Sequence, residues 1–209
     1  MKVLVLGATG KTGREIVRTA QAKGHEVRAL VRSLVRSREL DGAELVTGDA
    51  RDEVALLDAL EGCEAVISAL GTGISPFKEV TLLSTATSAL VRAMRARHVR
   101  RLVCITGMGA GDSRGHGGFF YDHLFQPLLL RKVYEDKDRQ EALVRASDMD
   151  WVLVRPTVLN DNPPRGKVRA LTDLNGFRGG AVSRSDVARF VVGQLDSETW
   201  LHRAPLVTW

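Results

Sequence analysis

The sequence predicts an α/β fold: a doubly wound, mainly parallel sheet with helices on both faces and a small C-terminal substrate region. Short apolar runs typical of buried strands recur along the chain, and most intervals between them carry apolar residues at helical spacing. Alternation of this kind is typical of parallel sheets that are covered by helices. The strands are expected at Val3–Leu6, Val27–Val31, Leu45–Thr47, Ala65–Ala69, Leu102–Thr106 and Trp151–Val154.

The first strand runs into a glycine-rich turn and then into a helix that we expect over Lys11–Ala22. The second strand follows within the length of one βαβ unit. Further helices are expected over Val54–Leu60 and Val80–Arg97. Apolar and small residues of the Val80–Arg97 helix could pack on the sheet or on a partner, so a monomer is favoured and a homodimer is the alternative.

The turn after the first strand, Gly7-Ala8-Thr9-Gly10-Lys11-Thr12-Gly13, has the spacing of a dinucleotide-binding motif. Its glycines stand where the backbone reverses, where it approaches a pyrophosphate, and where helix packs on strand. The helix that follows directs free N–H groups and a positive dipole end at the phosphates. A nucleoside-triphosphate P-loop would need a glycine at position 5, which holds Val5. The motif therefore predicts a Rossmann-type fold.

The end of the second strand favours NADP(H) over NAD(H). Arg32 stands there, and no acidic residue lies between Glu26 and Glu39. In such folds an acidic side chain here binds the ribose hydroxyls, whereas arginine accommodates a 2′-phosphate. Lys11 adds positive charge nearby. Asp49, after the third strand, has two open interpretations: it accepts from the adenine amino group, or it caps the next helix.

The composition points to a cytoplasmic protein with a small-molecule substrate. The 209 residues suit a single domain, residues 1–209, and no signal peptide or membrane-spanning run is recognised. The net charge of +5 comes from dispersed basic residues without a nucleic-acid-binding pattern, so neither nucleic acid nor membrane is an expected partner. Cys63 and Cys104 are expected to be small buried hydrophobes. The histidines lack metal-ligand spacing, so no metal is expected.

Two irregular segments, near 107–126 and 157–182, interrupt the alternation and are the candidate substrate pocket. The first is rich in glycine and leads into an aromatic and polar cluster that contains Tyr121 and His123. The second has loop chemistry from Asn160-Asp161-Asn162-Pro163-Pro164 through Gly179-Gly180.

Several motifs together resemble one family. They are the Gly7–Gly13 turn, Leu30-Val31-Arg32, Gly48-Asp49, Ser68-Ala69-Leu70-Gly71, Val154-Arg155-Pro156 and Ser183–Ala188. The chain resembles the atypical short-chain dehydrogenase/reductases of the NmrA-like branch, and is similar to their flavin reductase/biliverdin-IXβ reductase type. Functional residues of such sheets follow the strands, and together with this expectation the resemblance implies a set of cofactor contacts. They are Gly7, Thr9, Gly10, Lys11, Thr12, Gly13, Arg32, Asp49, Ala50, Ala69, Leu70, Gly71, Thr106, Lys137, Pro156 and Thr157.

The resemblance also frames the catalytic question. Many relatives use a tyrosine followed four residues later by a lysine, on one helix face. Here Lys137 and Glu141 match the family's lysine and glutamate, which puts Val133 in the tyrosine position and Tyr134 one residue away. Lys137 is then expected to bind the nicotinamide ribose, and Thr106 to contact the substrate carbonyl or the nicotinamide.

The proton donor has several candidates: Tyr134, Tyr121 and His123, or no protein group at all. A flavin or quinone accepts hydride while solvent supplies any proton, so the protein need only position two planar rings. We therefore expect an NADP(H)-dependent oxidoreductase that reduces a planar or aromatic acceptor such as a flavin, a quinone or a conjugated carbonyl. The alternatives are a non-catalytic NADP(H)-sensing regulatory protein and a non-redox isomerase or epimerase.

Overall fold

The computed structural model describes residues 1–37, 39–73, 79–116 and 130–209. Its strands are β1 (Lys2–Leu6), β2 (Glu26–Val31), β3 (Glu44–Thr47), β4 (Ala65–Ser68), β5 (Arg101–Ile105), β6 (Asp150–Pro156), β7 (Val158–Asn160), β8 (Arg169–Leu171), β9 (Ala181–Ser183) and β10 (Leu206–Thr208). Eight of them form one sheet in the order β3-β2-β1-β4-β5-β6-β10-β8, in which only the β10–β8 pair is antiparallel. Strands β7 and β9 form a separate parallel pair.

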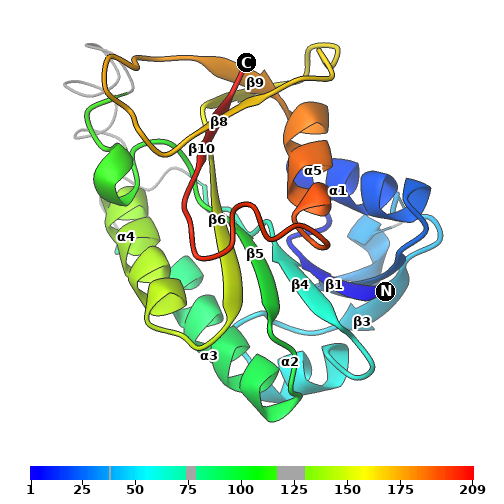
Figure 1. The fold of residues 1–209 in the computed structure, drawn as a ribbon. Helices are drawn as coiled ribbons and strands as arrows, with labels where there is room; N and C mark the ends of the chain where they lie inside the picture. Colours follow the sequence, from blue (N-terminus) through cyan, green and yellow to red (C-terminus); the bar gives the residue numbers. More distant parts are fainter. Residues whose placement is uncertain (38, 74–78, 117–129) are drawn as a thin grey trace.

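Helices cover both faces of this sheet (Figure 1). They are α1 (Lys11–Ala22), α2 (Glu53–Ala59), α3 (Leu82–Ala96), α4 (Arg131–Arg145) and α5 (Arg184–Gly193). The central strand β1 supplies both cores because its side chains alternate between the faces. Val3 and Val5 join the core formed with α1 and α5, whereas Leu4 and Leu6 join the core formed with α2 and α3.

The structure confirms the predicted doubly wound sheet and each of the six expected strands, with ends that differ by one or two residues. Helix α1 has the predicted bounds. Sequence reasoning missed the later strands β7 to β10, each of which has three residues. Runs that short carry too little periodicity to be recognised.

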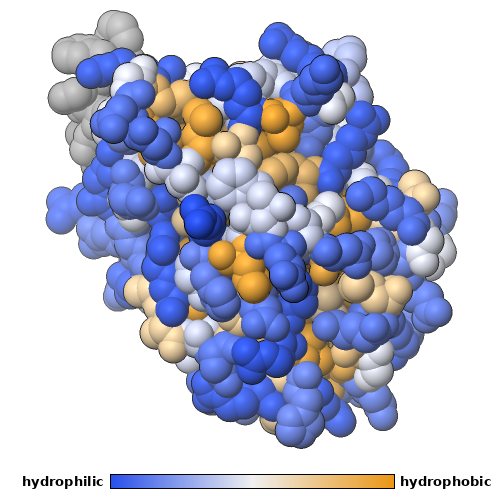
Figure 2. Space-filling view, viewed as in Figure 1, coloured by the Kyte–Doolittle hydropathy of each residue, from blue (hydrophilic) through white to orange (hydrophobic). Residues whose placement is uncertain are grey.

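The surface on the face seen in Figure 1 is mostly hydrophilic, and its apolar patches are small and separated (Figure 2). Cys63 and Cys104 are buried free thiols, as expected. Burial raises the pKa of both thiols, that of Cys104 to about 12. No helix within the described ranges has the length and apolarity needed to cross a membrane.

Candidate functional site

A cleft of about 620 Å³ opens at the carboxyl ends of β1, β2 and β4. It brings together these predicted cofactor residues: Gly7, Thr9, Gly10, Lys11, Thr12, Gly13, Arg32, Ala50, Ala69, Leu70 and Gly71. Its other lining residues are Leu30, Val31, Gly48, Thr72, Leu82, Leu159 and Arg184. Five predicted contacts do not line it: Asp49, Thr106, Lys137, Pro156 and Thr157. Parallel strands end at one edge of their sheet, which explains why residues far apart in sequence converge here.

The glycine turn is shaped by close backbone contacts. Gly7 has a φ of 77°, and a Cβ added to it would lie 2.5 Å from the carbonyl oxygen of Ala69. The amide of Gly10 donates to the Gly7 carbonyl at 3.0 Å, and Gly10 precedes α1 without a side-chain cap. The first turn of α1 contains no acidic residue, so its amide end is open to an anion. These features fit a dinucleotide diphosphate.

Two further groups of the cleft have unused binding capacity. Thr72 contributes a buried hydroxyl that no described residue contacts by a hydrogen bond. Buried polar atoms are normally paired, so this hydroxyl suits a ligand. Arg32 is exposed and forms no ion pair with any residue that the structure describes. Its guanidinium is therefore available to a phosphate.

Asp49 is held by a neighbouring arginine. It accepts from the backbone amide and the Nε of Arg51, both at 2.9 Å, and from Nη2 at 2.6 Å. Arg51 lowers the pKa of Asp49 to about 2, and the charge of Arg32 contributes. The helix-cap interpretation of Asp49 is wrong, because Asp52 caps α2 by accepting from the Val54 amide at 3.0 Å. The adenine contact of Asp49 stays a prediction.

A buried polar network lies at the end of β5. Lys137 of α4 donates a hydrogen bond from Nζ to the backbone carbonyl of Thr106. The Thr106 hydroxyl donates to Glu141 Oε1 at 2.8 Å. Arg155 of β6 donates to both carboxylate oxygens of Glu141, from Nε at 2.9 Å and from Nη2 at 2.5 Å. Two predicted catalytic residues, Thr106 and Lys137, are therefore joined through direct contacts.

Tyr134 and Lys137 lie one helical turn apart. The Tyr134 hydroxyl donates to the Met108 carbonyl at 2.7 Å, and Lys137 Nζ lies 5.1 Å from the Tyr134 ring centroid. Burial lowers the pKa of Lys137 to about 8, although the charge of Glu141 opposes this shift. The other two proton-donor candidates, Tyr121 and His123, lie outside the described residues.

The two candidate substrate segments meet. Their described parts touch where the His116 Nδ1 lies 3.1 Å from the Phe177 carbonyl oxygen and the Gly179 amide donates to the His116 carbonyl at 2.7 Å. Pro156 and Thr157 lie in the interior beside β10, where the Thr157 hydroxyl lies 3.2 Å from that of Thr208. These contacts explain why Pro156 and Thr157 do not line the cleft.

Sequence reasoning did not single out Arg184 or Arg155 as site residues, although both stand inside motifs that carried the resemblance. Arg184 begins α5 and reaches the cleft from the other end of the chain. The signal that could have found it is its position directly after Ser183, which caps α5 by accepting from the Asp186 amide. A cap residue fixes where the helix N-terminus begins.

Comparison with known proteins agrees with a dinucleotide-binding cleft. A family model described as NAD(P)H-binding matches residues 7–198. The Bacillus subtilis protein named uncharacterized sugar epimerase YhfK is 30% identical, over 98% of this chain and 92% of its own.

Two solved structures share the fold. ChuY, an anaerobillin reductase from Escherichia coli O157:H7, has a TM-score of 0.84 at 21% identity, covering 100% of this chain and 97% of its own. A short-chain dehydrogenase/reductase from Veillonella parvula in complex with NADP has a TM-score of 0.80 at 15% identity, covering 100% of this chain and 94% of its own.

Proposed function

This chain belongs to the NAD(P)H-binding family, and on that premise we propose that it is an NADPH-dependent oxidoreductase that transfers hydride to a planar acceptor. The observation that carries the proposal is the cleft that joins the glycine turn to the exposed Arg32 at the carboxyl edge of the sheet. Strand β5 lies next to β4 in that sheet, so Thr106 and Lys137 follow at the same edge. Flavins, quinones and conjugated carbonyls are the acceptor classes.

In this proposal the Gly7–Gly13 turn and the N-terminus of α1 hold the diphosphate, and Arg32 holds the 2′-phosphate. Bound NADPH supplies the hydride. Thr106 and Lys137 orient the nicotinamide end, since the Lys137–Thr106 contact fixes both at the end of β5. The glycine turn supports the placement of the diphosphate, because a side chain at Gly7 would collide with the loop after β4.

A planar acceptor fits the residues at the proton-donor position. Val133 is 7% exposed and stands at the position where many relatives have the tyrosine. The neighbouring Tyr134 donates a hydrogen bond from its hydroxyl to the backbone carbonyl of Met108. An acceptor that takes its proton from solvent needs neither group. For a conjugated carbonyl, which needs a proton, the candidate donor is the ammonium of Lys137, which contacts the Thr106 carbonyl.

The turnover test incubates the purified protein with NADPH and a panel of flavins, quinones and enones. Saturable loss of the reduced nicotinamide absorbance with at least one acceptor class is the expected result. A sugar epimerase is the second candidate function, because the Bacillus subtilis relative carries that name. Epimerisation would recycle the cofactor. An epimerised product with no net NADPH oxidation would therefore refute the reductase proposal and support the epimerase.

Arg32→Ala is expected to weaken NADPH binding by about 10- to 100-fold and to leave NADH binding unchanged. The reason is the loss of a charge-assisted hydrogen bond worth about 1.5–3 kcal/mol, which NADH lacks. Fluorescence titration of both dinucleotides measures the effect. Arg100→Ala is the control, because Arg100 is also exposed but lies at the opposite edge, paired with Asp150 at 3.3 Å. Equal losses for NADPH and NADH would refute the 2′-phosphate role.

Reduction of an enone is expected to depend on pH through Lys137. Its pKa is lowered to about 8, so the proton-donating ammonium is present below that pH and is lost above it. We expect kcat/KM to be flat at lower pH and to fall about tenfold per pH unit above the pKa. In Lys137→Arg the guanidinium stays protonated past about pH 12, so the fall should disappear. An unchanged fall in this variant would exclude Lys137 as the proton source.

A further inference from the structure

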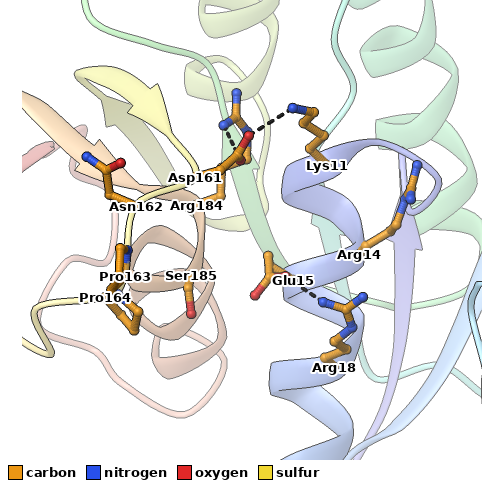
Figure 3. A pocket seen from close by; sticks show the side chains of 10 residues that line it. All are labelled: Lys11, Arg14, Glu15, Arg18, Asp161, Asn162, Pro163, Pro164, Arg184 and Ser185. Atoms are coloured by element: carbon orange, nitrogen blue, oxygen red, sulfur yellow. Dashed lines mark hydrogen bonds and ion pairs between the residues drawn. The ribbon is translucent and has the colours of Figure 1, made fainter.

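A second recess, of about 510 Å³, adjoins the cofactor cleft between α1 and α5 (Figure 3). Its lining residues are Lys11, Arg14, Glu15, Arg18, Asp161, Asn162, Pro163, Pro164, Arg184 and Ser185. Two of them, Lys11 and Arg184, also line the cofactor cleft. The boundary between the two spaces is therefore formed by two cations.

Asp161 links these two cations. Its Oδ2 lies 2.8 Å from Lys11 Nζ, and its Oδ1 lies 2.6 Å from Arg184 Nη1 (Figure 3). The side chains come from three distant parts of the chain: Lys11 begins α1, Arg184 begins α5, and Asp161 directly follows β7. Lys11 and Arg184 hold the pKa of Asp161 below its usual range, so it is ionised at neutral pH.

The surroundings of Asp161 attract anions. Lys11 and Arg184, the first residues of α1 and α5, both contact Asp161, so the N-termini of these two helices and their two cations lie close together. Helix N-termini and cations both favour negative charge. The other two arginines of the recess have their own acidic partners, because Arg14 pairs with Glu39 and Arg18 pairs with Glu15 at 2.7 Å. Asp161 is therefore the counter-charge for Lys11 and Arg184.

We propose that the Asp161 carboxylate is an internal substitute for the cofactor diphosphate. Asp161 competes with the dinucleotide for Lys11 and Arg184, and this competition sets the affinity of the protein for the dinucleotide. The inference rests on the proposed placement of the diphosphate at the glycine turn. The side chains of Asp161 and Lys11 are 59% and 69% exposed, so their ion pair is weak enough to exchange. An incoming diphosphate meets the same two cations, and the carboxylate between them repels it.

The test is Asp161→Asn, which keeps the shape of the side chain and removes its charge. We expect the Kd for NADPH to fall by about threefold to tenfold at low salt, because two cations are freed for the diphosphate. The gain should shrink as the salt concentration rises and screens these exposed charges. Binding is followed by NADPH fluorescence, so the readout needs no turnover.

Two matched variants separate local competition from general charge effects. Asp148→Asn changes the net charge equally, and Asp148 is also an exposed carboxylate, 2.8 Å from Arg95. It lies just before β6, at the opposite edge of the sheet, and should leave the Kd unchanged. In a Lys11→Met background, Asp161→Asn should give a smaller gain than in the native chain, because one of its two contested cations is already gone.

Tighter binding by Asp161→Asn alone, reduced in the Lys11→Met background, supports the proposal. Unchanged or weaker binding overturns it, because Asp161 then positions the two cations instead of competing for them. An equal gain in Asp148→Asn also overturns it. The reductase proposal would fail separately, if the native protein binds NADPH but does not oxidise it with any acceptor of the panel. The competition by Asp161 could still be measured in that case, because its readout is binding.

Discussion

Gly7→Ala is expected to abolish dinucleotide binding and to lower the free energy of unfolding by about 2–5 kcal/mol. The added Cβ would lie 2.5 Å from the Ala69 carbonyl oxygen, 2.7 Å from its carbonyl carbon and 3.0 Å from the Leu70 nitrogen. All three are backbone atoms, so no side chain can rotate away. Relief requires the turn after β1 and the loop after β4 to separate, and both of these segments line the cleft. Chemical denaturation and NADPH fluorescence measure the two effects.

Gly24→Ala is the matched control. Gly24 has a φ of 82°, close to the 77° of Gly7, but an added Cβ there meets no atom within 4 Å. Both variants therefore carry the same left-handed backbone strain, about 1–2 kcal/mol, and only Gly7→Ala adds a collision. Gly24→Ala should keep full NADPH affinity. Equal destabilisation by the two substitutions would show that strain, and not the contact with Ala69, makes glycine necessary at the turn.

The parts of this protein that could be predicted from sequence are those in which local pattern and tertiary role coincide. Residues of β1 alternate between two cores, so both faces of the strand are apolar, and a continuous apolar run results. The turn that follows needs glycine at Gly7 for a backbone reason that any Rossmann-type cleft shares. Arg32 could be found because it follows a strand that pattern alone had located.

The parts that could not be predicted depend on contacts between distant segments. Nothing near Lys11 or Arg184 in sequence indicates that Asp161 joins them. Local sequence left two interpretations open at Asp49, because Asp52, three residues later, is an equally suitable cap and is the residue that caps α2. Hydrogen-bond geometry, which decides between two such carboxylates, is set only after the chain has folded.

Arg155→Met is expected to lower the free energy of unfolding by about 3–5 kcal/mol. Arg155 and Glu141 are 2% and 3% exposed, and the substitution removes both short hydrogen bonds to the carboxylate. Among the hydrogen bonds and ion pairs of the described residues, Glu141 would then keep those to the Thr106 hydroxyl and to the more distant Arg145, at 3.7 Å. Removing one partner of a buried pair leaves a charge that the other groups cannot compensate. Urea denaturation of the variant and the native chain measures the loss.

The double variant Glu141→Met/Arg155→Met separates charge burial from function. It removes both members of the Arg155–Glu141 pair and so leaves neither of these two charges buried alone, and most of the lost stability should return. The Thr106 hydroxyl, however, would lose its acceptor Glu141 in this variant, and Thr106 is the residue whose carbonyl holds Lys137. We therefore expect a stable protein with normal NADPH binding and a reduced kcat.

Asp112→Asn is the control for the loss of stability. Asp112 also pairs with Arg155 but is 77% exposed, so the loss of its charge should lower the free energy of unfolding by less than about 1 kcal/mol. A double variant with native kcat would show that Glu141 stabilises the fold without positioning Thr106.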